Sequence, residues 1–293
     1  MKKIIFAALM AAALLSSCCA EQPKKGFGED FGIQLYSLRT LIGKPELYAE
    51  NGATVLKAIA EMGYKSVEPA SYQPEAGTIY GVSPEQFKAD VEAVGMKVLS
   101  SHVGHRLTEE ELAAKDFTPE LEWWAKCIEV HKTAGCKYLV MPSMPKDLQT
   151  LEQLQVYCDY YNAIGKMCKE AGLSFGYHSH SFEFVKIEDQ MMYDYMIEHT
   201  DPELVFFQMD VYWAVYGRVS PVEYFKKYPG RFKCLHIKDY REVGQSGMVG
   251  FDAIFKNVDI AGTEDFVVEM EKTGVGDILE TCRISINYLT GKE

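Results

Sequence analysis

The residues best suited to chemistry in this sequence are histidines and carboxylates that stand at the ends of short apolar runs. The histidines are His102, His178, His180 and His236, and the acidic residues are Glu68, Glu183, Asp210 and Glu269. Burying so many charges costs free energy unless an opposite charge neutralises them, and a divalent cation does so. Mixed imidazole and carboxylate ligands suit Mn²⁺, Co²⁺, Fe²⁺ or Zn²⁺ better than Mg²⁺ or Ca²⁺. The pattern therefore predicts one divalent metal ion, if the fold brings these run ends together.

Short β-type runs alternate with amphipathic helical stretches along the whole chain. We expect strands at residues 31–38, 66–69, 97–103, 138–142, 174–180, 204–211, 234–238 and 266–271. Helical patterns lie between them, among them 84–94, 119–133, 151–171, 221–227 and 277–289. Helix-to-strand turns are marked by Gly63, Gly95, Gly135 and Gly172, and Ser-Pro pairs at 83–84 and 220–221 mark helix starts.

Strict alternation of eight strands with helices allows a closed (β/α)8 TIM barrel or an open doubly wound sheet. An open sheet that binds dinucleotides or phosphates usually carries a glycine-rich turn after an early strand, and the sequence has neither GxGxxG nor GxxxxGK[S/T]. We therefore expect an α/β fold, a single-domain (β/α)8 TIM barrel over residues 31–293. In that fold the carboxyl ends of the strands build the active site, so the histidines and carboxylates would meet at one rim.

The N-terminus has the composition of an export signal. Lys2 and Lys3 precede an apolar run at residues 4–15 that is too short to span a membrane. The sequence Leu-Ser-Ser-Cys at 15–18 resembles the lipobox of bacterial lipoproteins, which implies lipidation of Cys18; the alternative is an ordinary cleaved signal with an incidental cysteine. We expect a signal peptide at 1–17 and a flexible tether at 18–30. The protein would then be anchored in the periplasm or outer membrane of a Gram-negative bacterium, with membrane contact through the lipid only.

Charge and cysteine usage narrow the functional classes. Without residues 1–17, 28 basic and 42 acidic residues remain, a net charge of about −14 that does not favour nucleic acid as a partner. The cysteines form no CxxC pair and most fall in apolar patterns, so we interpret them as buried small hydrophobes rather than disulfides. In the helical stretches, His131 and His199 are interpreted as surface or hydrogen-bonded residues, and Trp123 and Trp124 as packing on the outside of the barrel.

Three motifs carry a resemblance to a known family. They are YHSHSFEF at 177–184, LHIKD at 235–239 and GFDAIF at 250–255, followed by Glu269. On these motifs the chain resembles the xylose isomerase-like TIM-barrel superfamily, in the branch of sugar phosphate isomerases/epimerases that also includes ketose 3-epimerases and inosose dehydratase. The resemblance covers nearly the whole chain after the tether. It implies one metal ligand from each of the last four strands: His178, Asp210, His236 and Glu269.

Position 178 departs from the pattern of that family, in which the fifth strand typically supplies a glutamate. In the ketose epimerases, the glutamates of strands five and eight bind the metal and also act as two opposed bases. A neutral histidine that ligates a metal through one nitrogen is a poor base. His178 therefore argues against symmetrical two-base epimerisation and leaves single-base isomerisation or β-elimination open.

The chemistry that the resemblance implies is removal of a proton next to a carbonyl, which gives an enediolate that the metal stabilises. Candidate bases are Glu269 and Glu183, with His180 or His102 as the second proton-transfer group. Substrate contacts are expected from Glu68, Lys238, Arg241, Trp213 and Tyr36, with Tyr72 as a further ring for a sugar face. Two rival interpretations stay open: Glu68 as an ion pair inside the barrel mouth, and Lys238 with Asp239 as a structural ion pair.

We predict a metal-dependent sugar isomerase or epimerase that acts on a keto- or aldo-sugar. Export weakens a phosphosugar assignment, so an unphosphorylated sugar or glycoside is the expected small-molecule partner. One alternative is a lyase that performs β-elimination on keto-sugars or 3-keto-glycosides. Another is a carbohydrate-binding lipoprotein without turnover. The sequence leaves an oligomer open.

Overall fold

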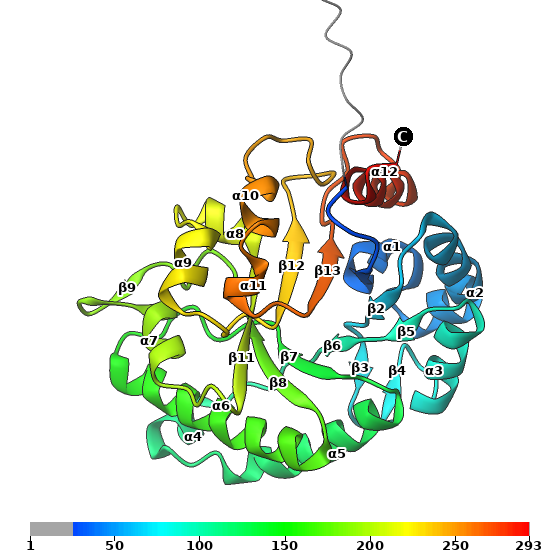
Figure 1. Ribbon diagram of the computed structural model, residues 1–293. Helices are drawn as coiled ribbons and strands as arrows, with labels where there is room; N and C mark the ends of the chain where they lie inside the picture. The colour runs from blue at the N-terminus through cyan, green and yellow to red at the C-terminus, as the bar shows by residue number, and fades with distance from the viewer. Residues whose placement is uncertain (1–25, 293) are drawn as a thin grey trace, which may run out of the picture.

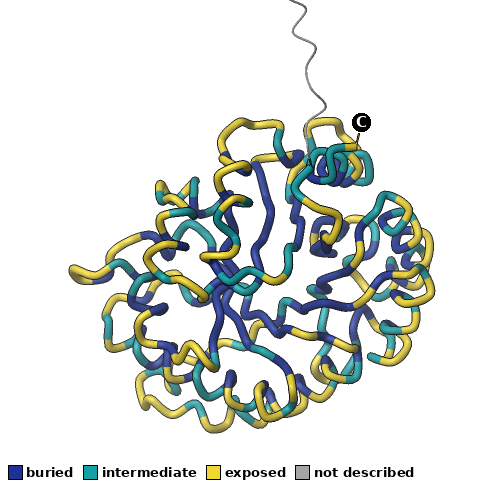
Figure 2. The backbone as a smooth tube through the Cα atoms, viewed as in Figure 1, coloured by how far each residue is buried: buried dark blue, intermediate teal, exposed yellow. Residues whose placement is uncertain are grey.

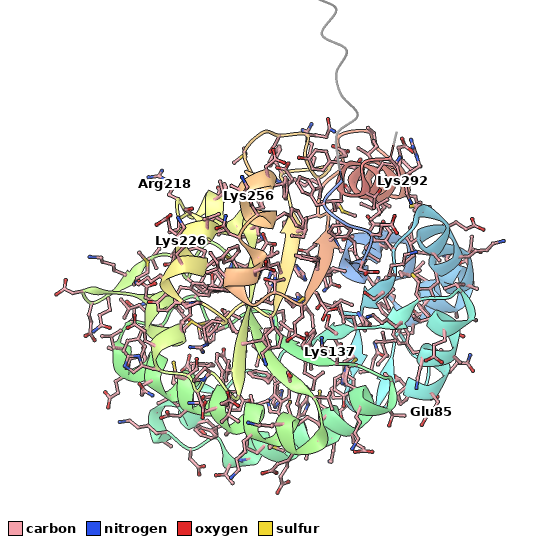
Figure 3. The ribbon with its side chains drawn as sticks, in the orientation of Figure 1. Glu85, Lys137, Arg218, Lys226, Lys256 and Lys292 are labelled. Atoms are coloured by element: carbon pink, nitrogen blue, oxygen red, sulfur yellow. The ribbon has the colours of Figure 1, made fainter. Side chains whose placement is uncertain are left out.

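A computed structural model describes residues 26–292 of the chain. The predicted signal peptide, Cys18 and the first part of the predicted tether lie outside the described residues. Helices surround a central ring of strands (Figure 1). The strands are buried, whereas the outward faces of the helices are exposed (Figure 2). Charged side chains such as Glu85, Lys226 and Lys256 lie on that outer surface (Figure 3).

The central sheet is a closed parallel barrel. Its strands are β1 (Phe31–Gln34), β2 (Ser66–Glu68), β5 (Lys97–Val98), β6 (Ser100–His102), β7 (Tyr138–Met141), β8 (Ser174–His178), β11 (Val205–Asp210), β12 (Cys234–Lys238) and β13 (Asp265–Glu269). They pair in the order β5-β2-β1-β13-β12-β11-β8-β7-β6. β5 and β6 are two halves of one pass: Leu99 donates from its N–H to Val67 O on one side, and its carbonyl accepts from Lys137 N on the other. The predicted (β/α)8 barrel is therefore confirmed.

The helices begin and end at residues with clear physical roles. They are α1 (Arg39–Ile42), α2 (Pro45–Met62), α3 (Pro84–Ala93), α4 (Glu109–Ala114), α5 (Thr118–Thr133), α6 (Leu151–Ala171), α7 (Met192–Glu198), α8 (Val211–Tyr216), α9 (Pro221–Lys227), α10 (Phe251–Phe255), α11 (Val258–Ala261) and α12 (Ile278–Thr290). The Ser83 and Ser220 hydroxyls accept N-cap bonds from Gln86 N and Glu223 N. Gly172 ends α6 in the left-handed region at φ 87°, as predicted for a glycine between helix and strand.

A short 3₁₀ helix and two hairpins lie outside the main barrel strands. A 3₁₀ helix, η1 (Leu35–Leu38), follows β1, and two antiparallel hairpins pair β3 (Tyr72–Gln73) with β4 (Thr78–Ile79) and β9 (Lys186–Ile187) with β10 (Gln190–Met191). The strand predicted at 31–38 therefore ends at Gln34, and half of that prediction is wrong. The physical reason is local, since the Gln34 side chain accepts a hydrogen bond from Tyr36 N and turns the chain into η1.

The inside of the barrel changes from apolar to polar along the strands. At the amino end, Tyr138, Phe206, Cys234 and Val267, from four strands, belong to one small buried apolar cluster. Successive side chains on a strand face opposite sides, so residues two apart share a face. Phe206 is thus followed on the inner face by Gln208 and Asp210. The carboxyl end of the barrel is where the buried polar residues gather.

The cysteines and the first described residues test two further predictions. The six cysteines of the described region are all buried and free, as predicted: Cys127, Cys136, Cys158, Cys168, Cys234 and Cys282. The flexible tether predicted to run through residue 30 is wrong in its last part, because Phe27 stacks on Phe255 with ring centroids 4.4 Å apart and donates from its N–H to Leu289 O at 2.7 Å. Within the described residues, no helix is long and apolar enough to cross a membrane.

Candidate metal centre and substrate cavity

Four buried side chains from consecutive strands converge at the carboxyl end of the barrel. They are His178 at the end of β8, Asp210 at the end of β11, His236 in β12 and Glu269 at the end of β13. One potential ligand atom from each lies within 4.8 Å of the others. We call this set the ligand group. The structure thus brings together the four residues that the resemblance implied.

Hydrogen bonds on the outer side of the ligand group leave its inner atoms without partners. His236 Nε2 lies 2.7 Å from Glu68 Oε1, whereas the buried Nδ1 of the same ring has no hydrogen-bond partner. Asp210 Oδ1 accepts from Trp213 N at 2.8 Å, and the buried Oδ2 is unpartnered. Buried polar atoms are nearly always satisfied, so two unpartnered atoms within one buried group need an explanation. This donor set fits a divalent cation of the transition-metal type.

The two carboxylates of the ligand group, Asp210 and Glu269, differ in how far nearby positive charge compensates them. Burial raises the pKa of Asp210 to about 7, with the Lys238 ammonium as the main opposing influence. Burial also opposes ionisation of Glu269, yet Lys238, whose Nζ lies 3.4 Å from Glu269 Oε2, holds the pKa of that carboxyl well below its usual range. Asp210 is the carboxylate of the group with the least compensation, which is where a cation would contribute most.

Glu68 lies at the centre of a buried hydrogen-bond network rather than in contact with the cavity. Burial alone would raise its pKa, but His102 and His236 hold that pKa at about 2. Its Oε1 lies 3.1 Å from His102 Nε2, and both oxygens also accept from neighbouring side chains. The expectation that Glu68 contacts a sugar hydroxyl is wrong, because the structure leaves neither oxygen available; the rival interpretation of a buried ion pair is the correct one.

A cavity of about 700 Å³ opens above the ligand group. Its inner end is lined by His102, His178, His180 and Glu269. Burial lowers the pKa of His180 to about 4, and also lowers the pKa of His102. The buried Nδ1 of His180 has no hydrogen-bond partner. The predicted proton-transfer residues His180, His102 and Glu269 therefore share one cavity wall.

The outer end of the cavity is aromatic. Trp123 in α5 lines it together with His105 and Tyr72. The Trp123 and His105 rings stack with centroids 4.2 Å apart and an interplanar angle of 3°, and Tyr72 meets Trp123 edge-on at 5.6 Å. The prediction that both tryptophans pack away from the site is wrong for Trp123, because the amino-terminal half of α5 reaches the rim. It is right for Trp124, which is fully buried.

Other predicted site residues lie in different surroundings. Tyr36 lines the cavity and is 46% exposed. Glu183 is fully buried behind the wall, where it accepts from Tyr177 Oη at 2.7 Å and from His180 N at 2.9 Å, so its assignment as a base in contact with substrate is wrong. Arg241 is exposed over the Tyr240 ring and does not line the cavity, so the structure does not support it as a substrate contact.

Lys238 and Asp239 make separate contacts. Lys238 Nζ lies between Glu269 and Glu271, 3.2 Å from Glu271 Oε1, and is 5.9 Å from the Trp213 ring. Asp239 instead accepts from backbone N–H groups of its own loop, such as that of Gly244. The rival interpretation of a Lys238–Asp239 ion pair is therefore wrong. Trp213 stands beside the cavity, with its ring centroid 5.9 Å from that of His180.

Two helical histidines differ in environment. His131 is fully buried and donates from Nδ1 to the Cys127 carbonyl 2.8 Å away, so of the two predicted alternatives the hydrogen-bonded one holds for it. His199 stacks on Tyr195, with Nδ1 2.8 Å from Tyr195 O. Neither residue lies near the ligand group.

Sequence reasoning missed Gln208, Lys146 and Glu271. Gln208 lies two residues before Asp210 on the same strand, so the alternation of β11 places both on the inner face; that signal was available. Lys146 and Glu271 come from loops after β7 and β13, and both line the cavity. Their positions depend on loop conformation, for which no local pattern exists.

A family model described as a xylose isomerase-like TIM barrel matches residues 56–289. The chain belongs to this family. A solved structure of a sugar phosphate isomerase/epimerase from Parabacteroides distasonis is 35% identical, covers 89% of this chain and 97% of its own, and superposes with a TM-score of 0.79.

Curated relatives of the family are inosose dehydratases. The protein from Bacillus cereus is 27% identical over 266 residues, which is 78% of this chain and 85% of that protein. The protein from Geobacillus kaustophilus is 25% identical over 202 residues, 64% of this chain but only 61% of the relative. These isomerase/epimerase and dehydratase relatives are consistent with an enzyme of the sugar isomerase/epimerase-like type.

Proposed function

We propose that this protein is a divalent-metal-dependent sugar isomerase or epimerase that removes a proton next to the carbonyl of an unphosphorylated keto- or aldo-sugar. The observation that carries the proposal is the ligand group, in which the unpartnered Asp210 Oδ2 and His236 Nδ1 lie behind His178 and Glu269, the two members that line the inner end of the cavity. Mn²⁺, Co²⁺, Zn²⁺ or Fe²⁺ fits the mixed nitrogen and oxygen donors better than Mg²⁺. His178, Asp210, His236 and Glu269 would hold the ion.

When bound, the metal would supply a positive charge that holds the substrate's carbonyl and hydroxyl oxygens and stabilises the negative charge that develops on them. The chain's own residues move the proton. His180 offers an unpartnered Nδ1 on the cavity wall, while Glu269 is held in its ionised form beside Lys238. His180 is therefore the stronger candidate for the base, with Glu269 as the alternative and His102 as the second proton-transfer group.

The charge of the cavity wall favours a substrate without phosphate. Among the described residues that line the cavity, Lys146 is the one Lys or Arg, and three carboxylates, Glu75, Glu269 and Glu271, share the wall with it. A phosphate dianion is usually bound by several donors, Arg side chains above all. The cavity wall supplies only one such donor among its described residues.

The size and the outer wall of the cavity favour a glycoside over a single ring. A cavity of about 700 Å³ exceeds the volume that one hexose fills. The outer aromatic wall, Trp123 with His105 and Tyr72, presents flat apolar surfaces of the kind that pack on the non-polar faces of sugars. We propose that the reacting ring lies at the ligand group and that the rest of the glycoside lies against Trp123.

Elimination is a second candidate outcome of the same proton removal. It is favoured by His178, because a ligand histidine at this position leaves no second carboxylate base on the β8 side to return a proton to the opposite face. It is also favoured by the inosose dehydratase relatives. If a leaving group stands β to the carbonyl, the electron pair left by the proton expels it and forms an alkene.

The test is a substrate screen in D₂O with metal-loaded protein. We expect ¹H NMR to show deuterium entering the carbon next to the carbonyl of keto-sugars or 3-keto-glycosides. Deuterium with an otherwise unchanged molecule supports isomerisation, and a new alkene or a released aglycone supports elimination. E269Q should abolish exchange, while E85Q, on the outer surface of α3, should retain it. Binding without exchange for every sugar would contradict the proposal and leave a carbohydrate-binding protein.

A further inference from the structure

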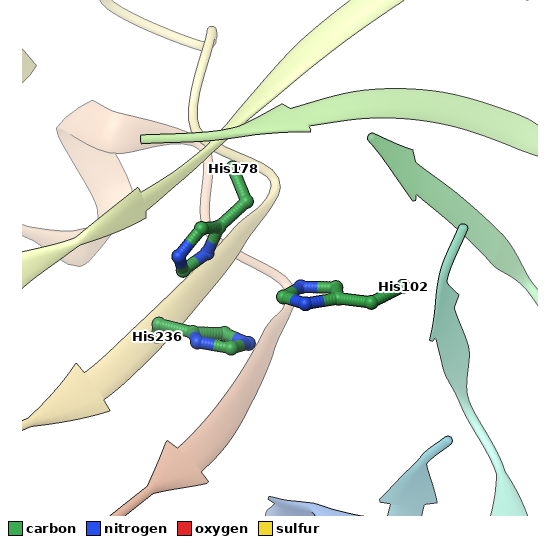
Figure 4. A group of neighbouring side chains, drawn as sticks. All are labelled: His102, His178 and His236. Atoms are coloured by element: carbon green, nitrogen blue, oxygen red, sulfur yellow. The ribbon is translucent and has the colours of Figure 1, made fainter. Parts of the chain in front are cut away.

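We infer that Gln208 and Glu68 are positioning residues that fix which ring nitrogen carries the proton in three histidines, His102, His178 and His236. The three rings lie side by side in the barrel mouth, with centroids 4.5 to 5.0 Å apart (Figure 4). A neutral imidazole has one donor and one acceptor nitrogen, and its neighbours decide between the two tautomers. The consequence for metal binding rests on the proposed function, but the proton positions do not.

The orientation of the Gln34 side-chain amide is fixed by a backbone N–H, which can only donate. Tyr36 N donates to Gln34 Oε1 at 2.9 Å, so the amino group of Gln34 faces the other way and donates to Glu68 Oε1 at 2.7 Å. Glu68 receives this bond on one oxygen and the Ser100 hydroxyl on the other. An ionised carboxylate of this kind is an acceptor only.

Glu68 then orients Gln208. The fully buried Gln208 amide donates from Nε2 to Glu68 Oε2 at 2.9 Å. Turning the amide over would set its carbonyl oxygen at that distance from a carboxylate oxygen, which is repulsive. Gln208 Oε1 therefore faces the histidines, and it lies 2.8 Å from His102 Nε2 and 3.1 Å from His178 Nδ1.

Because an amide oxygen only accepts, both facing nitrogens must carry protons. His178 is thereby the Nδ1–H tautomer, and its bare Nε2 is the atom that it can offer to the ligand group. His236 donates from Nε2 to Glu68 Oε1 at 2.7 Å, so its unpartnered Nδ1 is the nitrogen that it can offer to the ligand group. The Gln208 amide thus leaves Nε2 of His178 for the metal, whereas the Glu68 carboxylate leaves Nδ1 of His236.

The neighbours of His102 likewise place its proton on Nε2 and leave Nδ1 without one. Its Nε2 is shared between Gln208 Oε1 at 2.8 Å and Glu68 Oε1 at 3.1 Å, both acceptors. His102 lines the cavity, and because its Nε2 faces two acceptors, Nδ1 is the proton-accepting nitrogen of the neutral ring. This places any role of His102 in proton transfer at Nδ1.

The direct test is histidine NMR. In metal-free protein labelled with ¹⁵N-histidine, two-bond ¹H–¹⁵N spectra should show His178 as Nδ1–H and His102 as Nε2–H, with a proton on Nε2 of His236. Finding Nε2–H on His178 in the wild-type protein would overturn the inference, whatever the protein catalyses. Correct tautomers without any metal binding would instead support the inference and contradict the proposed function.

A variant separates positioning from general stability. Q208M keeps the volume but offers no acceptor, so His178 and His102 should lose their fixed tautomers while His236, held by Glu68, keeps Nε2–H. A zinc chloride titration should show affinity reduced about 10- to 100-fold. The control Q190M, an exposed position in β10, should change neither. Unchanged tautomers and unchanged zinc affinity in folded Q208M would overturn the role of Gln208.

Discussion

His236 Nε2 lies 2.7 Å from Glu68 Oε1, and this contact turns the opposite ring nitrogen, Nδ1, toward Glu269 Oε2, 3.6 Å away. A carboxylate behind a histidine is the usual arrangement around metal-binding imidazoles, because it fixes the tautomer and raises the basicity of the ligand nitrogen. The proposed metal centre follows from this relationship.

Removing the carboxylate of Asp210 should separate metal binding from folding. D210N keeps the shape and the acceptor for Trp213 N but removes the negative charge of the unpartnered Oδ2. We expect zinc affinity, measured by isothermal titration calorimetry, to fall by at least about tenfold. The unfolding free energy of the metal-free protein should be unchanged or higher, since an unpartnered buried charge is costly. D259N, at an exposed position in α11, is the control; equal zinc affinity in the two variants would contradict the assignment.

Trp123 should matter for glycosides and not for single rings. W123A removes the outer aromatic wall of the cavity, 4.2 Å from His105, without touching the ligand group. We expect KM for a glycoside to rise about tenfold with kcat nearly constant, because the lost contact binds ground state and transition state equally. W123F should recover most of the affinity. An identical effect on a keto-monosaccharide would show that Trp123 does not bind the second part of the substrate.

Glu183 should make stability depend on pH. Burial raises its pKa to about 7, against a reference value of 4.5, so the folded protein prefers the protonated form. This contribution is fully present below pH 4.5 and is lost as the pH rises to 7, about 3 kcal/mol in all. Urea unfolding at pH 5 and pH 8 should show a smaller loss in E183Q than in the wild-type protein, with the remaining loss due to Asp210, whose pKa burial also raises to about 7. Parallel profiles would mean that Glu183 is ionised in the folded state.

Much of the fold and part of the site could be predicted because they depend on local patterns. Residues 234–238 and 151–171 were predicted with the observed bounds, since apolar alternation and a Thr150 cap with Gly172 define them. Three members of the ligand group stand at strand ends and His236 lies within β12, at the same level of the barrel, where barrel topology makes all four neighbours. Trp123 was assigned wrongly because the periodicity of a helix does not show which end of that helix reaches the rim of the barrel. Glu183 was assigned wrongly because a sequence motif does not show which carboxylate is buried behind the cavity wall.

The N-terminal segment, outside the described residues, carries its own proposal. We propose that Cys18 is lipidated and that the barrel is held at the bacterial envelope by this lipid. Expression of the full chain with labelled palmitate should give a labelled membrane-associated protein, and C18S should abolish the label and prevent accumulation of the lipidated form. Label retained in C18S, or a wild-type protein recovered entirely in the soluble fraction, would contradict the anchor.

The most direct test of the central claim is anomalous diffraction from crystals of protein loaded with zinc or manganese. The account predicts one strong anomalous peak per chain, at about 2.0–2.2 Å from a nitrogen of His178, an oxygen of Asp210, Nδ1 of His236 and an oxygen of Glu269. A peak bound elsewhere, or none between these four side chains at saturating metal, would contradict it.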